Sequence, residues 1–220
     1  MTKIIVFEGI DGTGKTGQLT RLHDRLTKSG LTVATLSFPV YTSFFGREVG
    51  NLLAGTEGVT ADTVDGKSMA LWYALDRFEA FQHFDYSGAD VLLINRFVLS
   101  NAVYQSIRDR DLGKPDVLDF VLALEHEHFH LPRPDAYLVL DVLPDRAAKN
   151  VDAKGFREYV GNARDVYEAI PSLQERARLK YLEDADRLDN VYVIPCMEGN
   201  RLKSIEAIGN QIDSVLKDIL

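Results

Sequence analysis

The segment GIDGTGKT, residues 9–16, combines glycines, a lysine and a threonine at a spacing suited to holding a polyphosphate. It fits G-x-x-x-x-G-K-[ST], in which glycines let the backbone point its N–H groups at phosphate oxygens. Lys15 is placed to bridge the outer phosphates, and the hydroxyl of Thr16 is placed to ligate Mg²⁺. The predicted nucleotide-binding residues are Gly9, Asp11, Gly12, Thr13, Gly14, Lys15 and Thr16.

Two positions within this loop bear on where the phosphate goes. Gly12 carries no charge, so a positive charge for a transferring phosphoryl group must come from elsewhere in the chain. Asp11 has two interpretations: its carboxylate binds a hydroxyl of a substrate, or it stabilises the turn through its own backbone. The loop alone does not choose among switches, motors and small-molecule kinases.

Two further stretches carry aromatic and basic side chains suited to a second ligand. SFPVY, residues 37–41, ends a predicted strand, and YALDRF, residues 73–78, lies on a predicted helix. Tyr73 and Arg77 stand at i and i+4 of that helix, so both face the same way. Taken singly, Tyr73 is also typical of a core aromatic residue, and Arg77 of a surface ion pair.

A third stretch, NRFVLSNAVYQ, begins at the end of another predicted strand and spans residues 95–105. Arg96 precedes a helix that displays three polar side chains within one turn of each other. These are Ser100, Asn101 and Tyr104. Taken singly, Arg96 is equally typical of a residue that caps carbonyl groups, but the three stretches together, in this order, favour a binding site.

Short apolar runs alternate with longer amphipathic stretches along the chain. The runs cover residues 3–9, 32–38, 89–95, 135–142 and 190–196 and show little alternation, as expected of strands buried on both faces. Helical patterns cover residues 15–29, 44–54, 61–84, 98–108, 114–130, 144–151, 162–187 and 201–219. The alternation predicts one α/β domain over residues 1–220, a three-layer sandwich with a parallel five-stranded sheet.

The composition limits which binding partners and which cellular compartment are expected. The 220 residues are 45% hydrophobic and 26% charged, which is typical of a globular domain. A net charge of −8 argues against a dominant electrostatic grip on nucleic acid. The one cysteine, Cys196, lies in an apolar run and is expected to be a buried thiol in a reducing compartment. No signal peptide and no apolar run near ~20 residues is seen, so a cytoplasmic protein without membrane partners is expected.

The chain resembles the thymidylate kinase family over nearly its whole length. The similar segments are FEGIDGTGKT, the FP-x-Y turn, ALDR, the R-[YF]-x-x-S-N-x-x-Y block, PDAYLVLDV, RDVYE and SLQERARLKYLEDAD. The resemblance implies a P-loop nucleoside monophosphate kinase fold and a homodimer. It also implies ATP-dependent phosphorylation of dTMP to dTDP, with Mg²⁺ on the donor phosphates.

For this substrate, the resemblance implies a role for each residue around the base. Tyr73 is expected to stack on the pyrimidine, and Arg77 to donate a hydrogen bond to a ring carbonyl. The amide of Asn101 is expected to satisfy the N3 edge with its paired donor and acceptor. Tyr104 is expected to crowd the 2′ position and so favour deoxyribose.

The sugar and phosphate are expected to meet a second group of residues. Phe38 would border the sugar, and Asp11 would accept a hydrogen bond from the 3′-hydroxyl. Arg96 and Lys15 would hold the monophosphate for in-line attack, with Tyr41 nearby. No dedicated base is expected, because the acceptor phosphate is already an anionic nucleophile.

Residues 151–164 are expected to form a lid that supplies the positive charge missing at Gly12. The catalytic candidates on this lid are Lys154, Arg157 and Arg164. A solvated charged loop is the alternative interpretation of these residues. Just after the lid, Asp165 and Tyr167 align with family positions that help shape the acceptor pocket.

Asn95 departs from the family pattern, which usually has Asp-Arg where this chain has Asn95-Arg96. A neutral amide in the outer sphere of a Mg²⁺ site is expected to lower metal affinity or turnover without removing activity.

Two other features invite a metal-site interpretation. His126 and His130 in LEHEHFH stand at i and i+4, but the segment is more typical of a connection into the next strand. Asp141 ends a predicted strand, and capping the helix that begins at Pro144 is favoured over ligating magnesium.

Two alternatives to the kinase hypothesis remain open. A deoxynucleoside kinase would need a carboxylate base, for which Glu8 is the candidate. A nucleotide-binding paralogue with weakened catalysis is favoured by Asn95. Four intact residues argue against this hypothesis: Lys15, Thr16, Arg77 and Arg96.

Overall fold

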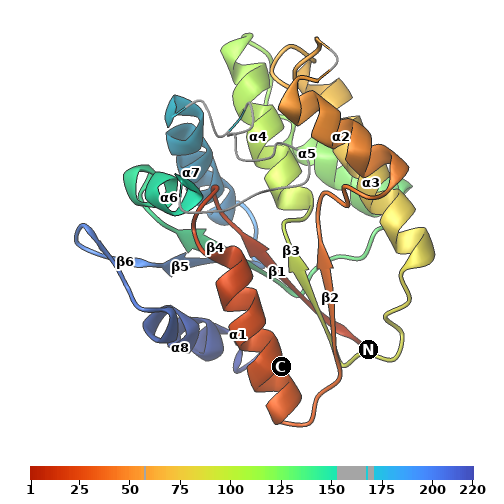
Figure 1. Ribbon diagram of the computed structural model, residues 1–220. Helices are drawn as coiled ribbons and strands as arrows, with labels where there is room; N and C mark the ends of the chain where they lie inside the picture. The colour runs from red at the N-terminus through yellow and green to blue at the C-terminus, as the bar shows by residue number, and fades with distance from the viewer. Residues whose placement is uncertain (57, 153–166, 168–170) are drawn as a thin grey trace.

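Five strands form one parallel sheet in the order β2-β3-β1-β4-β5 (Figure 1). The strands are β1 Lys3–Glu8, β2 Val33–Ser37, β3 Val91–Asn95, β4 Ala136–Asp141 and β5 Val191–Pro195. This computed structural model describes residues 1–56, 58–152, 167 and 171–220. The predicted parallel five-stranded sheet is confirmed.

The three central strands contribute fully buried side chains to the hydrophobic core. Ile5 of β1, Leu92 of β3 and Leu138 of β4 have no exposed surface. The edge strands β2 and β5 are only partly buried, and Val193 of β5 remains 36% exposed. The prediction that all five runs are buried on both faces therefore holds for the central strands and is wrong for the edges, where fewer neighbours cover the strand.

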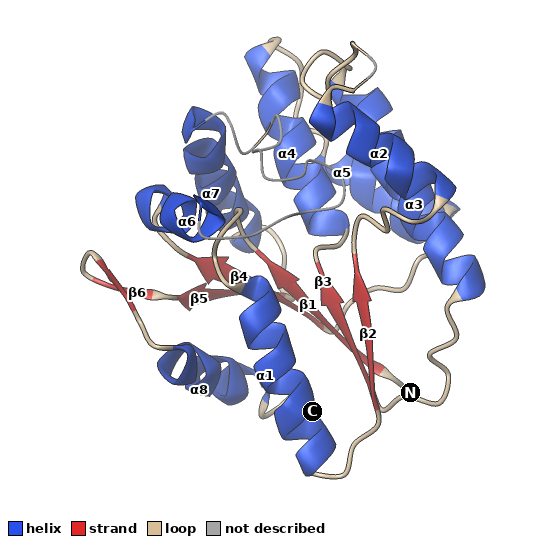
Figure 2. Cartoon of the chain, viewed as in Figure 1, coloured by secondary structure: helices blue, strands red, loops and turns tan. Residues whose placement is uncertain are grey.

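Helices cover both faces of the sheet. They are α1 Lys15–Lys28, α2 Phe44–Ala54, α3 Gly66–His83, α4 Val98–Asp111, α5 Leu118–Leu122, α6 Pro144–Asp152, α7 Pro171–Ala185 and α8 Ile205–Leu216. Figure 2 shows α1 and α8 on one side of the sheet, and the other helices on its far side and beyond the carboxyl ends of the strands. The three-layer architecture is confirmed.

Side-chain caps set where several helices begin. Asp65 accepts a hydrogen bond from the N–H of Ser68, so α3 begins later than the predicted residue 61. Ser204 likewise caps α8 by accepting from the N–H of Ala207. Residues 201–202, predicted as helix, instead form strand β7 Arg201–Leu202, which pairs with β6 Met197–Glu198.

The predicted helix over 114–130 is divided. After α5 the backbone continues as a π-helix, Ala123–His128. The wider turn buries two adjacent polar residues, Glu125 and His126, on the inner side.

Parallel pairing of β1 with β3 brings the two loops that follow these strands together. Phe7 lies opposite Asn95 in the register, so the segment beginning at Gly9 emerges beside Arg96. Pairing of β1 with β4 places Glu8 opposite Val139 on the other side. The phosphate loop thus occupies the centre of the carboxyl edge of the sheet, where open α/β sheets bind ligands.

Two further features concern the chain as a whole. No helix in the described ranges is long and apolar enough to span a bilayer. Cys196 is fully buried, and its Sγ donates to the carbonyl of Ile194 at 3.2 Å. Burial raises the pKa of this thiol to about 12, so Cys196 is a core residue, as predicted, rather than a nucleophile.

Candidate active site

The phosphate loop has the backbone that its glycines were predicted to allow. Gly9, Gly12 and Gly14 all have positive φ, at 127°, 82° and 91°, a region that residues with a side chain rarely adopt. Helix α1 begins directly after Gly14, so its first N–H groups face the loop. The side chain of Lys15 folds back over the loop, donating to the carbonyls of Gly9 at 2.9 Å and Ile10 at 2.8 Å.

Helix α6 packs directly on this loop. A Cβ atom at Gly12 would lie 2.0 Å from the carbonyl oxygen of Ala147 in α6. Asn150 of α6 also donates its Nδ2 to the Gly12 carbonyl at 2.8 Å. Glycine at this position is therefore required by packing as well as by φ, and no larger side chain, charged or not, fits while α6 stays in place.

Arg96 and Asp11, both predicted to contact the acceptor, contact each other. Arg96 Nη2 lies 2.5 Å from Asp11 Oδ1, and the side chains are 18% and 21% exposed. The other guanidinium nitrogen, Nη1, donates to Ser100 Oγ at 3.1 Å. Arg96 itself has a positive φ of 63°, an uncommon conformation for a residue with a side chain and one that clusters at functional sites.

Two tyrosines complete this side of the site. Tyr104 donates to Asp11 Oδ2 at 3.4 Å and stacks on Tyr167, with ring centroids 5.5 Å apart and an interplanar angle of 7°. Gln174 of α7, which the sequence did not single out, accepts from Tyr104 at 3.3 Å and donates to the carbonyl of Tyr167 at 3.1 Å. The predicted residues Asp11, Tyr104 and Tyr167 are thus brought together.

Glu8 is buried and hydrogen-bonds to the segment that follows Arg96. It has no exposed surface, and it accepts hydrogen bonds from the N–H of Phe97 at 2.9 Å, from Ser100 Oγ and from Tyr181 at 3.0 Å. Burial raises the pKa of its carboxyl group. Because Glu8 is enclosed and its oxygens are already bonded, the hypothesis that it is the base of a deoxynucleoside kinase is wrong.

The hydroxyl of Ser100 is part of the same network. It contacts Glu8, Tyr181 at 2.8 Å and Arg96, and the residue is only 9% exposed. The prediction that Ser100 binds substrate is therefore corrected to an internal role: Ser100 joins the buried carboxylate of Glu8 to the guanidinium of Arg96.

Arg77 and Asn101, expected to read the base, lie side by side in the interior. Arg77 is 2% and Asn101 3% exposed, and both hydrogen-bond to the fully buried Glu125. The surface ion pair offered as the alternative for Arg77 is wrong, because its partner is a core carboxylate. The sequence did not single out Glu125, which lies among the histidines of LEHEHFH.

Phe38 is also more buried than a residue bordering a sugar would be. It is 4% exposed and packs against Phe81 and Phe97, at ring-centroid distances of 6.2 and 5.9 Å. Tyr41 and Tyr73 are half-buried. The turn that carries Tyr41 is held by Asp76 of the ALDR segment, whose carboxylate accepts from the N–H of Val40 at 3.2 Å. Burial raises the pKa of Asp76 to about 6.

Asn95 stands at the end of β3. Its Nδ2 donates to Ser37 Oγ at 2.9 Å, while its Oδ1 is buried and has no hydrogen-bond partner among the described residues. Thr16 at the start of α1 is exposed, as a hydroxyl that ligates an ion must be. Lys154, Arg157, Arg164 and Asp165 lie outside the described residues, as does most of the predicted lid.

The fold also places the histidines of LEHEHFH and Asp141, for which metal binding was not the favoured interpretation. His126 is buried and its Nδ1 lies 3.1 Å from the Leu131 carbonyl, whereas His130 is exposed beyond the end of the π-helix. Burial lowers the pKa of His126. Asp141 pairs with Arg178, at 2.5 and 3.0 Å, rather than serving as the predicted cap of α6.

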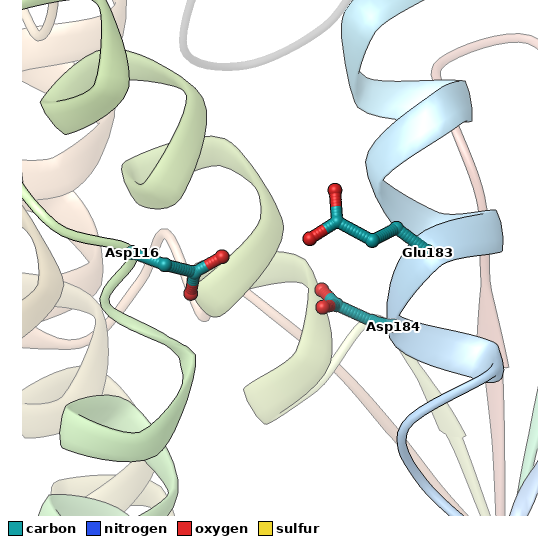
Figure 3. A group of neighbouring side chains, drawn as sticks. All are labelled: Asp116, Glu183 and Asp184. Atoms are coloured by element: carbon teal, nitrogen blue, oxygen red, sulfur yellow. The ribbon is translucent and has the colours of Figure 1, made fainter.

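A cluster of carboxylates lies apart from the phosphate loop. Figure 3 shows Asp116, from the loop before α5, facing Glu183 and Asp184 of α7. Lys180 contacts all three, at 2.7 Å from Asp116 and 3.4 Å from Glu183, and Arg110 binds two of them. These cations already neutralise the cluster, which therefore ties α7 to the end of α4 instead of holding a metal.

Comparisons with known proteins agree with this geometry. The family model described as Thymidylate kinase matches residues 7–204. The chain is 32% identical to a thymidylate kinase of Mycobacterium tuberculosis over 183 residues, covering 82% of this chain and 84% of the relative. It is 26% identical to a probable thymidylate kinase of Thermococcus onnurineus over 219 residues, covering 97% and 96%.

A solved structure shows the same fold. The thymidylate kinase of Candida albicans superposes with a TM-score of 0.73 at 19% sequence identity, covering 99% of this chain and 92% of that one. The family match spans the phosphate loop, the Arg96 segment and the buried pair of Arg77 and Asn101. The chain belongs to the thymidylate kinase family.

Proposed function

We propose that the protein transfers the γ-phosphoryl group of ATP to dTMP, giving dTDP and ADP, as a kinase of nucleotide biosynthesis. The observation that carries this proposal is that two cations suited to binding phosphate follow neighbouring strands of the sheet. Lys15 lies on the loop after β1, and Arg96 follows the neighbouring strand β3. A donor polyphosphate and an acceptor monophosphate held by these residues would adjoin one another at the centre of the sheet edge.

The protein groups act mainly by position and charge. The N–H groups of the phosphate loop and the start of α1 hold the donor phosphates, and Lys15 leaves its two loop carbonyls to bind them. Arg96 holds the acceptor phosphate, aligned by Asp11 and by Ser100. The acceptor oxygen is anionic, so no proton has to be removed from it by a base.

The oxygen ligands present fit a magnesium ion that is held mostly by the nucleotide. Thr16 is exposed and offers a hydroxyl. The amide oxygen of Asn95 is buried and has no partner among the described residues, which suits a position in the outer sphere of the ion. Both oxygens are neutral. When bound, Mg²⁺ would neutralise charge on the donor phosphates, while the protein itself contributes no carboxylate at the Asn95 position.

The acceptor pocket is proposed to hold thymine between aromatic and amide groups. Tyr73 stacks on the base, and Arg77 and Asn101 meet its polar edge. Tyr104 and Tyr167, stacked on one another beside Asp11, enclose the deoxyribose. The proposed lid cations are Lys154, Arg157 and Arg164, and Asp165 is proposed to help shape the acceptor pocket.

We also propose a cytoplasmic homodimer. Two exposed apolar side chains support an interface on α2 and α3, which pack on each other: Phe44 is 54% and Leu71 is 40% exposed. Sedimentation of the purified protein tests this proposal. A dimer that Leu71→Glu converts to monomer is expected, and a monomeric wild-type protein at micromolar concentration would contradict it.

A substrate panel tests the reaction. The protein, ATP and Mg²⁺ are incubated with dTMP, dUMP, dCMP, dGMP and thymidine, and the products are separated by ion-exchange chromatography. The proposal expects dTDP from dTMP and no phosphorylation of thymidine. Formation of dTMP from thymidine would instead identify a nucleoside kinase.

Asn95 favours one second candidate, a nucleotide-binding paralogue with weakened catalysis. That candidate expects dTMP to raise the thermal midpoint of the protein without any dTDP being formed. The same panel, with a thermal-shift measurement added, separates it from the kinase.

A further inference from the structure

Three buried polar side chains form a closed group behind the proposed base pocket. Glu125, Arg77 and Asn101 are 0%, 2% and 3% exposed. Glu125 Oε2 accepts from Arg77 Nε at 2.5 Å, and Oε1 accepts from Arg77 Nη2 at 2.6 Å and from Asn101 Nδ2 at 3.0 Å. The carboxylate therefore holds the two residues proposed to face the base.

The contacts fix which way the amide of Asn101 points. Its Nδ2 donates to the backbone carbonyl of Ala70 at 3.0 Å as well as to Glu125. Both partners accept hydrogen bonds and cannot donate. A reversed amide would set Oδ1 against a carbonyl and a carboxylate, so chemistry determines the orientation. Oδ1 is left as a buried acceptor with no partner in the described part of the chain.

Arg77 is constrained in a complementary way. Two of its three nitrogens, Nε and Nη2, are used by Glu125. The third, Nη1, makes no hydrogen bond to any residue that the structure describes. Buried polar groups in native proteins nearly always have partners, so the buried Oδ1 of Asn101 indicates a ligand that donates to it. The neighbouring Nη1 of Arg77 can donate to an acceptor on the same ligand.

The keto pyrimidines have that pattern, and cytosine does not. Thymine and uracil carry a donor at N3 and a carbonyl acceptor at C4. Cytosine carries an acceptor at N3 and an amino donor at C4, so both contacts would be mismatched. We propose that Glu125 is the positioning residue that sets this selectivity, by presenting Asn101 as an acceptor and Arg77 as a donor; this rests on the proposed function.

A purely structural role for Glu125 is the competing explanation. A buried ion pair is often no more stable than apolar residues of similar size, so burial alone does not account for this group. The two explanations differ in one observable. A structural residue affects all substrates alike, whereas a selectivity residue changes the ratio of kcat/KM for dTMP to that for dCMP.

Glu125→Gln is the decisive variant. Its side chain still accepts from Arg77 but can place a donor against Asn101 Nδ2, so the amide of Asn101 loses one of the two acceptors that orient it and keeps only the Ala70 carbonyl. The ratio of kcat/KM for dTMP to dCMP is expected to fall at least about tenfold, with dUMP following dTMP. An unchanged ratio in the folded variant would overturn the proposal.

Glu127→Gln is the matched control. Glu127 lies two residues further along the same segment, is 64% exposed and pairs with Arg133 at the surface at 3.5 Å. This variant is expected to keep the wild-type ratio. A loss of selectivity in Glu127→Gln equal to that in Glu125→Gln would also count against the proposal.

A second pair of variants covers the case in which Glu125→Gln does not fold. Arg77→Met alone leaves Glu125 holding Asn101, whereas Arg77→Met with Glu125→Met removes both buried charges. The double variant is expected to select less well between dTMP and dCMP than the single variant does. Equal selectivity in the two would overturn the role of Glu125.

Binding is measured beside turnover, so that a failure of the proposed function is recognised as such. The shift in thermal midpoint with dTMP, dUMP and dCMP reports the pocket even without catalysis. A wild-type protein that binds dTMP over dCMP without turnover contradicts the kinase only, and the variants then test Glu125 by their shifts. A wild-type protein that binds no pyrimidine monophosphate contradicts both.

Discussion

Arg96 Nη2 lies 2.5 Å from Asp11 Oδ1, joining the loop after β3 to the phosphate loop after β1. The pair is only partly exposed, and Ser100 and Tyr104 hold its two ends. Because both residues face the position proposed for the acceptor, the ion pair sets the direction of Arg96 before substrate arrives.

Asp11→Asn is expected to loosen Arg96 while keeping the size of the side chain. A hydrogen bond between charged groups contributes about 1.5–3 kcal/mol, so kcat/KM for dTMP should fall about tenfold to hundredfold. Steady-state kinetics checks this. Asp24→Asn, on an exposed part of α1, is the control, and kinetics of Asp11→Asn equal to those of this control would refute the role of the pair.

Asn95→Asp is expected to introduce a carboxylate beside the proposed Mg²⁺ site. Ser37, which now accepts from Asn95 Nδ2 at 2.9 Å, can donate to a carboxylate instead, so the fold should tolerate the change. The Mg²⁺ concentration that gives half-maximal activity should fall, because the site gains a negative charge. An unchanged Mg²⁺ titration, matching that of Asn200→Asp in the exposed β6–β7 turn, would show that position 95 does not influence the metal.

Gly12→Ala is expected to destabilise the protein strongly. Its Cβ would lie 2.0 Å from the Ala147 carbonyl at a φ of 82°, so α6 has to move off the phosphate loop. The control is Gly14→Ala, which has a similar φ of 91° but no atom within 4 Å of the new Cβ. Both variants carry backbone strain of about 1–2 kcal/mol. We expect a clearly lower thermal midpoint for Gly12→Ala than for Gly14→Ala. Equal midpoints would exclude packing against α6 as a cause of the lost stability.

Asp184→Asn is expected to change how stability depends on pH. Burial raises the pKa of the Asp184 carboxyl from 3.8 to about 6, so the folded state binds this proton more tightly than the unfolded chain does. The protonated Asp184 carboxyl therefore contributes to the free energy of unfolding. This contribution is fully present below about pH 4 and is lost as pH rises through 6. Relative to Asp184→Asn, the wild-type protein should therefore lose up to about 3 kcal/mol across this window.

Denaturant unfolding at a series of pH values measures this difference. Asp119→Asn is the control, because Asp119 is 88% exposed although it contacts Arg187, another member of the same charged region. Stability–pH curves that stay parallel for wild type and Asp184→Asn would mean that Asp184 titrates alike in the folded and unfolded chain.

The sequence predicted the sheet, the phosphate loop and most residues around it, because these signals are local. Apolar runs mark the strands, and the spacing from Gly9 to Thr16 marks the loop. The supporting residues were missed because their contacts join distant parts of the chain: Glu8 meets Tyr181 across 173 positions, and Arg77 meets Glu125 across 48. Nothing near Glu125 distinguishes it from a helix-surface glutamate.

Two residues that were predicted to contact the substrate are buried instead. Ser100 and Phe38 stand beside the predicted site, but the packing of α4 and the aromatic cluster turned them inward. The π-helix Ala123–His128 had no sequence signal of its own, and it is the turn that buries Glu125. Side-chain direction at these positions follows from packing that composition and periodicity do not encode.

The rate of ADP release with ATP, Mg²⁺ and dTMP tests the central claim most directly, measured for wild type, Lys15→Ala and Arg96→Ala. We expect rapid release by the wild-type protein and a loss of about a hundredfold or more in each variant, since each removes a charge that holds one of the two phosphates. Wild-type protein that binds dTMP but releases no ADP, or variants as fast as wild type, would contradict the account.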